Sequence, residues 1–347
     1  MLIGLCGGIC SGKRSIAEYL VREEGFTLLE LTNPDGLKFS DGEDHLAYYT
    51  KRRNPPDSEF VFDSVDSLLE FVTKRWRERW VITDIWDSNI VDRLLVRPFF
   101  LLVSVDAPVS IRWQRFRNRC WQRQLDPPEL EKFLLSNDRH LYDPNLGRAY
   151  LTDRAHVRVF NSSSSLQELY AALKNLNLAD ERRLRPSWDQ YFMQLASLAA
   201  QRSNCMKRRV GCVIVRDCRV ISTGYNGTPR HLDNCNEGGC PRCNRGDGAG
   251  ANLSTCLCLH AEENALLEAG RERLREGAIL YCDTCPCLTC TVKIAQVGIS
   301  EVVYSQSYNM DEESAALLQA AGIRLRQFCP PRNGLIQLQA LGEARDN

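Results

Sequence analysis

The sequence has no long hydrophobic run, no net charge and no recognisable export signal. Its longest nearly uninterrupted apolar stretch, Pro98 to Val105, is far shorter than the roughly 20 residues of a membrane-spanning helix. The first ten residues lack the basic region and cleavage site of a secretory signal. Lys plus Arg and Asp plus Glu both number 44, so no global positive field attracts a nucleic acid polymer. We therefore expect a cytoplasmic protein without a membrane or polynucleotide partner, a nuclear fraction being left open.

Internal repeats are also absent, although 347 residues are too many for one ordinary domain. The composition, 44% hydrophobic and 25% charged, is typical of a globular chain. Residues 181–186 are polar and end in a helix-breaking proline, which indicates a boundary. We expect one domain at residues 1–180, a second at 186–330 and a C-terminal tail at 331–347.

Cysteine is scarce in the first domain and abundant in the second. Only three of the 16 cysteines precede residue 186. Eight of the others form closely spaced pairs: Cys240 and Cys243, Cys256 and Cys258, Cys282 and Cys285, Cys287 and Cys290. In a chain without an export signal, this density favours thiolate metal ligands over disulfides.

Hydrophobic periodicity predicts an α/β protein. Before residue 160 it predicts strands at 2–5, 80–85 and 99–105 and helices at 13–23 and 109–124. Ser187 caps a further helix, and a hairpin of strands follows at 210–215 and 219–223. Helices and strands then alternate to about residue 327, starting with a helix from His260. This order predicts a mixed sheet with helices on both faces.

Two short motifs in the second domain indicate a catalytic metal. His260-Ala-Glu262 and Pro286-Cys287-Leu-Thr-Cys290 both stand at predicted helix starts. One imidazole and two thiolates make a three-ligand zinc site whose fourth tetrahedral position is open, as in catalytic zinc centres. Glu262 is a nearby carboxylate that is free to transfer protons, the arrangement found in zinc deaminases. A structural zinc or free thiols with an incidental His-Glu pair is the alternative.

Five segments in this domain resemble the deoxycytidylate (dCMP) deaminases: residues 202–205, 209–215, 224–229, 260–265 and 286–299. The resemblance covers about residues 187–328 and is closest to the fungal form, which has an extra N-terminal domain. It implies a cytidine-deaminase-like three-layer α/β/α fold. It also implies hydrolysis of dCMP to dUMP and ammonia for thymidylate synthesis, by a homohexamer that dCTP activates and dTTP inhibits, with Mg²⁺ accompanying these effectors.

The resemblance assigns roles to individual residues. His260, Cys287 and Cys290 would bind zinc, and Glu262 would transfer protons. Three further residues correspond to substrate-binding positions: Asn226 for the pyrimidine, Ser203 and Tyr308 for the phosphate. The cationic run at 207–209 would suit a phosphate as well, but a solvated charged turn explains it equally.

The irregular stretch at 224–259 is too long to be ordered by its own hydrophobic contacts. The resemblance implies a second, structural zinc on Cys205, Cys235 and Cys258. Its fourth ligand would be Cys240 or Cys243, and free thiols are the alternative.

The first domain carries an altered phosphate-binding loop. Gly7, Gly12 and Lys13 fit the pattern of a P-loop, but Arg14 replaces the hydroxyl residue that binds Mg²⁺. Residues 1–175 resemble dephospho-coenzyme A kinase-like domains, which implies a P-loop kinase-like α/β fold. Without the Mg²⁺ ligand we expect nucleotide binding or an assembly role, and no phosphoryl transfer.

Two other functions remain open at this stage. The second domain could deaminate another cytosine or cytidine substrate. The chain could instead be a regulatory protein that senses nucleotides, although sensing does not require the His260, Glu262, Cys287 and Cys290 set.

Overall fold

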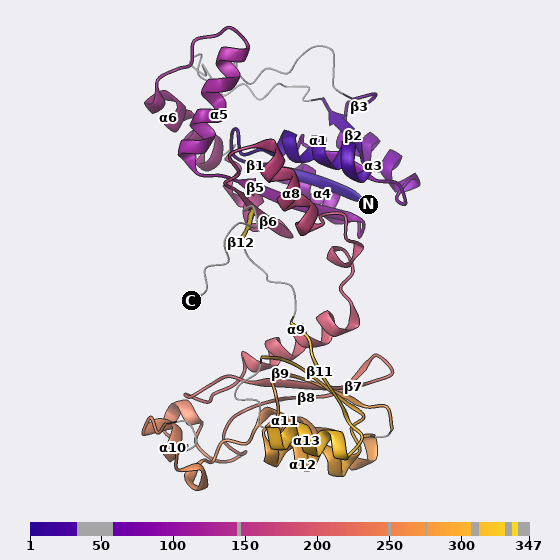
Figure 1. The fold of residues 1–347 in the computed structure, drawn as a ribbon, viewed down its shortest axis with the longest axis vertical. Coiled ribbons are helices and arrows are strands. Elements are labelled where there is room, and N and C mark those ends of the chain that lie inside the picture. The colour runs from indigo at the N-terminus through magenta and orange to yellow at the C-terminus, as the bar shows by residue number, and fades with distance from the viewer. Residues whose placement is uncertain are drawn as a thin grey trace. The chain divides into compact units, whose positions relative to one another are not determined.

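The computed structural model describes residues 1–32, 58–143, 147–248, 251–274, 276–306, 312–329 and 335–338. The chain divides into a first unit, Met1–Arg185 with Arg332–Asn347, and a second unit, Pro186–Pro331. Figure 1 shows the helices and strands of each unit. The chain therefore leaves the first unit once and returns to it near its C-terminus.

The first unit is built on a parallel sheet of seven strands in the order β12-β6-β5-β1-β4-β2-β3. Its strands are β1 (Leu2–Gly7), β2 (Thr27–Leu31), β3 (Phe60–Phe62), β4 (Trp80–Ile82), β5 (Phe100–Asp106), β6 (Val157–Asn161) and β12 (Leu335–Leu338). Its helices are α1 (Lys13–Glu24), α3 (Val65–Lys74), α4 (Ser88–Leu95), α5 (Val109–Gln122), α6 (Leu130–Tyr142), α7 (Ala149–Asp153) and α8 (Leu166–Leu176), followed by the short η1 (Glu181–Arg183).

Alternate residues of β1 enter two separate cores, as expected for a sheet covered on both faces. Ile3 and Leu5 pack with residues of α1 and α8. Leu2 and Cys6 pack with residues of α3 and α4. The first unit is thus an α/β layer structure in which the central strands β1 and β5 are buried except at their last residues, Gly7 and Asp106.

The C-terminal segment differs from the sequence expectation. The sequence predicts a separate tail at 331–347, whereas Leu335–Leu338 forms the edge strand β12, which pairs in parallel with β6. The two strands lie more than 170 residues apart in the chain, so no local pattern reveals their pairing.

The second unit contains a mixed sheet of five strands in the order β11-β10-β9-β7-β8. Strands β7 (Gly211–Arg216) and β8 (Arg219–Tyr225) form the predicted hairpin. Its turn residues Asp217 and Cys218 both have positive φ, which suits a tight two-residue turn. Strand β9 (Ile279–Thr284) runs antiparallel to β7, and β10 (Glu301–Gln306) and β11 (Arg324–Gln327) continue it in parallel.

Helices cover both faces of this sheet, as the sequence predicts. Helix α9 (Trp188–Ala200) packs on one face, against Val213 and Val215 of β7. The other face, with Cys212 and Ile214, carries α11 (Ala261–Ala269), α12 (Leu288–Val297) and α13 (Glu312–Ala320). Figure 1 shows the three layers α9, sheet and α11–α13 within this unit. The predicted mixed α/β sheet is therefore confirmed.

Two glycines allow these helices to lie close to the sheet. A Cβ atom at Gly211 would collide with the backbone of Ala196 in α9, and one at Gly224 with the backbone of Ala261 in α11. Because α11 begins at Ala261, Gly224 fixes the distance between β8 and the start of that helix.

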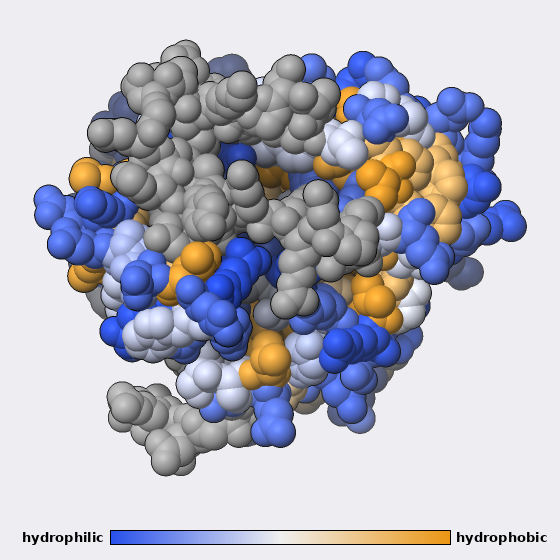
Figure 2. Space-filling model, turned by 90° about the horizontal axis from the view of Figure 1, so that it is seen from above, coloured by the Kyte–Doolittle hydropathy of each residue, from blue (hydrophilic) through white to orange (hydrophobic). Residues whose placement is uncertain are grey.

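Within the described part of the segment between β8 and α11, the only regular structure is a set of short helical turns. They are η2 (Cys235–Glu237), α10 (Pro241–Asn244) and η3 (Leu253–Thr255), and η4 (Arg271–Arg273) follows α11. Among the described residues no helix combines the length and apolar character needed to cross a membrane. On the face seen in Figure 2, hydrophilic residues predominate and hydrophobic residues form separate patches among them.

Candidate functional site

The starts of two neighbouring helices bring the predicted zinc ligands together. His260 is the N-cap of α11, Cys287 is the N-cap of α12, and Cys290 lies in the first turn of α12. The Nδ1 atom of His260 lies 3.4 Å from Cys287 Sγ and 3.3 Å from Cys290 Sγ. All three ligand atoms lie within 4.8 Å of one another.

These distances fit a tetrahedral zinc ion. With Zn–S bonds of about 2.3 Å and Zn–N bonds of about 2.0 Å, ligand atoms of a tetrahedron lie about 3.5–3.8 Å apart. The observed separations are close to that range. Three protein ligands leave one tetrahedral position for water or substrate.

Neighbouring residues fix the ligands in place. Glu263 accepts a hydrogen bond from the backbone N–H of His260 at 2.8 Å, which closes a capping box at the start of α11. The same carboxylate forms an ion pair with Lys293 of α12. On α12, Thr291 donates its hydroxyl to the Cys287 carbonyl at 3.0 Å. The two helix starts are thus tied both internally and to each other.

Glu262 differs from Glu263 in its surroundings. It is 4% exposed, and burial raises the pKa of its carboxyl to about 7. A hydrogen bond from Cys290 lowers the pKa of Cys287 to about 3, which favours the thiolate that a metal requires. Glu262 is not part of the three-ligand group. Its carboxyl is therefore a buried group next to the ligands that is available for proton transfer.

Asn226 and Ser203 lie together in one buried network. The Asn226 side-chain oxygen accepts hydrogen bonds from Ser203 Oγ at 2.7 Å and from Val210 N at 2.8 Å, and its amide nitrogen donates to Arg208 O at 2.7 Å. These bonds hold the loop after β8. The substrate contacts predicted for Asn226 and Ser203 stay predictions. Tyr308 lies outside the described residues.

A short backbone bridge places this loop beside the predicted metal ligands. Gly227 exchanges two backbone hydrogen bonds with Leu259, the residue before His260, at 2.9 and 3.2 Å. Of the cationic run, Lys207 donates to the carbonyls of Asp247 and Gly248. Lys207 therefore holds the cysteine-rich segment as well as adding positive charge.

A second group of cysteines lies between α9 and α11. The four cysteines expected to hold a structural zinc have Sγ atoms within 4.8 Å of one another: Cys205, Cys235, Cys243 and Cys258. Cys240, the other candidate for the fourth ligand, lies in an overlapping group with Cys243, Cys256 and Cys258. Cys256 is not among the ligands predicted from the sequence, although its Cys-x-Cys spacing with Cys258 is visible there.

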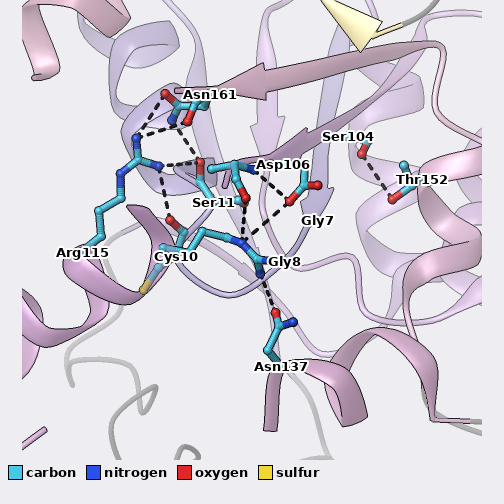
Figure 3. A network of polar contacts seen from close by, with 12 residues as sticks. Gly7, Gly8, Cys10, Ser11, Ser104, Asp106, Arg115, Asn137, Thr152 and Asn161 are labelled. Atoms are coloured by element: carbon cyan, nitrogen blue, oxygen red, sulfur yellow. Dashed lines mark hydrogen bonds and ion pairs between the residues drawn. The ribbon is translucent and has the colours of Figure 1, made fainter. Parts of the chain in front are cut away.

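The residues that fit the P-loop pattern connect β1 to α1: Gly7 is the last residue of β1, and Lys13 is the first residue of α1. Gly7 and Gly12 have positive φ, and Gly12 is the N-cap of α1. Arg115 donates to the Ser11 carbonyl at 3.2 Å, and Asn161 donates to the same oxygen at 3.0 Å. Figure 3 shows this network around the loop.

Lys13 and Arg14 point to different partners. The Lys13 amine donates to the carbonyls of Gly7 and Gly8 at 2.8 and 2.7 Å, and burial lowers its pKa to about 8. Arg14 lies 3.7 Å from Glu18 in a half-exposed ion pair one turn along α1. Lys13 is thus bound within the loop, while Arg14 pairs along the helix.

Comparison with known proteins places the site in a family. Residues 186–306 match the family model described as the cytidine and deoxycytidylate deaminase zinc-binding region. The deoxycytidylate deaminase of Schizosaccharomyces pombe is 50% identical over 336 residues, which cover 96% of this chain and 99% of that protein. The deoxycytidylate deaminase of Saccharomyces cerevisiae is 52% identical over 277 residues, which cover 77% of this chain and 86% of the yeast protein.

A solved structure is also similar. The dCMP deaminase from cyanophage S-TIM5 in complex with dCMP and dUMP is 28% identical, covers 42% of this chain and 98% of that chain, and has a TM-score of 0.34. The family match confirms the cytidine-deaminase-like fold and a zinc-binding region for the second unit. With half of its residues shared along nearly the whole of a fungal relative, the chain belongs to the deoxycytidylate deaminase family.

Proposed function

We propose that this chain hydrolyses dCMP to dUMP and ammonia, and so supplies dUMP for thymidylate synthesis. The convergence of His260, Cys287 and Cys290 beside the buried Glu262 carries the proposal. Membership of the deoxycytidylate deaminase family supports the choice of substrate.

The chemistry divides between metal and protein. His260, Cys287 and Cys290 would hold the zinc ion, which would supply the Lewis acidity that activates the attacking water. Glu262 accepts a proton from the attacking water and donates it to N3 of the pyrimidine. The same carboxyl then takes the remaining proton from the hydroxyl group now on C4 and passes it to the amino group, which leaves as ammonia when the C4–N bond breaks. Its burial keeps bulk water from competing for these protons.

We infer that the loop after β8 holds the substrate. Asn226 would position the pyrimidine, and Ser203 and Tyr308 would contact the phosphate. The Asn226–Ser203 network and the Gly227–Leu259 bridge support this role, because they tie the loop to the residue before His260. Activation by dCTP, inhibition by dTTP, the accompanying Mg²⁺ and a homohexameric assembly are further parts of the proposal that rest on the family resemblance.

We infer for the first unit a P-loop kinase-like domain that binds nucleotide or serves assembly without transferring phosphate. A parallel sheet with the loop between β1 and α1 supports the resemblance. The replacement of the Mg²⁺ ligand by Arg14, which pairs with Glu18, supports the loss of turnover.

A substrate panel tests the proposed function. We expect ammonia release from dCMP to exceed release from CMP, cytidine and deoxycytidine. Higher activity on another of these would favour a different cytosine substrate. A zinc-loaded chain that binds nucleotides but releases no ammonia would favour the sensing role.

A further inference from the structure

Six cysteine side chains of the second unit form two overlapping groups of four. Two members, Cys243 and Cys258, belong to both groups. Cys205 and Cys235 complete one group, and Cys240 and Cys256 complete the other: the Sγ atoms within each group lie within 4.8 Å of one another. No cysteine of the three-ligand active site belongs to either group.

The sulfur separations match those around a tetrahedral metal. With Zn–S bonds of about 2.3 Å, the edge of a ZnS₄ tetrahedron is about 3.8 Å. The distance from Cys205 Sγ to Cys243 Sγ is 3.8 Å, and that from Cys243 Sγ to Cys258 Sγ is 3.9 Å. In the second group, Cys240 Sγ lies 3.9 Å from Cys256 Sγ. A disulfide would need about 2.05 Å, and all six cysteines are free.

We propose that the six cysteines bind two zinc ions in one binuclear cluster. Cys243 and Cys258 bridge the two ions, Cys205 and Cys235 bind only the first, and Cys240 and Cys256 bind only the second. Each ion then has four thiolate ligands, the closed coordination of a structural site. This arrangement goes beyond the single structural zinc that the family resemblance implies.

The local core supports metal binding because, among the residues that the structure describes, it consists of cysteines. Cys235, Cys240 and Cys243 are buried, and Cys205, Cys256 and Cys258 pack around them, with no described aliphatic or aromatic side chain in the cluster. The described backbone around them forms only short helical turns and no strand. Six thiols bury too little apolar surface to order such a segment, whereas metal–thiolate bonds contribute folding free energy directly.

Hydrogen-bond donors next to Cys240 and Cys256, the two cysteines specific to the second group, favour their thiolate form. The Arg242 side chain is 7% exposed, and its guanidinium lies 3.9 Å from Cys256 Sγ. Across the described part of the chain Arg242 has no carboxylate partner, its other bonds going to the carbonyls of Ala251 and Gly248. The backbone N–H of Leu257 donates to Cys240 Sγ at 3.4 Å. A buried cation beside Cys256 fits an anionic cluster, since unpaired buried charge is costly.

Metal analysis of the full-length chain tests the stoichiometry. We expect three zinc ions per chain, one in the active site and two in the cluster. Cys240→Ser should remove one of them, and the matched Cys218→Ser, at an exposed turn of the hairpin, should remove none. Two zinc ions in the wild type, or no loss in Cys240→Ser, would overturn the proposal.

The Zn–Zn distance in the wild-type chain gives a second test, which does not depend on whether a variant folds. Because each bridging sulfur lies about 2.3 Å from both ions, the two ions must lie less than about 4.6 Å apart. Zinc K-edge X-ray absorption should therefore show a Zn–Zn distance below this limit. Its absence in a zinc-loaded chain, together with alkylation of Cys240 and Cys256, would show a single-ion site. A chain that shows the Zn–Zn distance but does not turn over dCMP would contradict the proposed function and still support the binuclear cluster.

Discussion

At the residue scale, two adjacent glutamates have different roles: Glu262 is proposed to transfer protons, and Glu263 stabilises the start of α11. Glu262 is buried and belongs to no ligand group, whereas Glu263 caps α11 and pairs with Lys293. Both follow His260 in the sequence, and the motif alone assigns the proton-transfer role to Glu262. The structure is consistent with that prediction, because Glu262 is 4% exposed whereas the Glu263 side chain is 16% exposed.

Glu262→Gln should retain zinc and lower kcat about 100-fold or more, because an amide preserves the shape but cannot transfer protons. Steady-state ammonia release and metal content measure the two effects. Glu263→Gln is the matched control: its amide oxygen can still accept the His260 N–H bond, so kcat should change only a few-fold. Activity of Glu262→Gln above a tenth of wild type would contradict the assigned role.

At the element scale, the close packing of β8 against α11 places the helix start that carries His260. The carbonyl oxygen of Ala261 and the backbone of Ala265 occupy the space next to Gly224. The sequence does not show this role, because a glycine at the end of a strand is equally consistent with a turn. The position of His260 therefore depends on a contact that only the fold reveals.

Gly224→Ala should destabilise the chain by about 1–3 kcal/mol, since the methyl group has backbone atoms in its way. Denaturant unfolding measures the loss, and zinc content shows whether the start of α11 has shifted. Gly248→Ala provides the control, because a Cβ there meets no atom within 4 Å. Equal stability of the two variants would contradict the packing argument.

Much of the second unit was predictable from sequence. The hairpin, the helix starts at His260 and Cys287 and the alternating helices and strands follow from local patterns that tertiary contacts reinforce. The first unit was less predictable: β2, β3 and β6 are short strands, and β12 pairs with a strand far away in the chain. The proximity of Cys240 to Cys256 likewise depends on how an irregular segment folds back on itself.

At the scale of the whole molecule, all proposed metal ligands lie in the second unit, while the chain passes through the first unit at both ends. This arrangement predicts different outcomes for the two halves. A fragment ending at Arg185 would lack β12 and leave an edge of its sheet, at β6, unpaired.

A fragment covering Pro186–Pro331 should bind as much zinc per chain as the full-length protein, because it contains every proposed ligand and the whole five-stranded sheet. Metal analysis after gel filtration provides the comparison. A soluble, folded fragment without zinc would show that the metal sites depend on the first unit.

The proposed P-loop of the first unit leads to a separate expectation. Lys13 is held by loop carbonyls and no hydroxyl stands at position 14, so the chain should not transfer phosphate from ATP to nucleosides, nucleotides or dephospho-coenzyme A. Radiolabelled ATP provides the assay. Transfer that Lys13→Ala abolishes would contradict this expectation.

The central claim is that a zinc-loaded active site in the second unit deaminates dCMP, and product analysis of the full-length chain tests it most directly. Chromatography of the reaction with dCMP should show dUMP and ammonia forming in equal amounts. The Glu262→Gln variant, with its zinc retained, should form no more than trace amounts of dUMP and ammonia. Zinc-loaded wild-type chain that leaves dCMP unchanged would contradict the account.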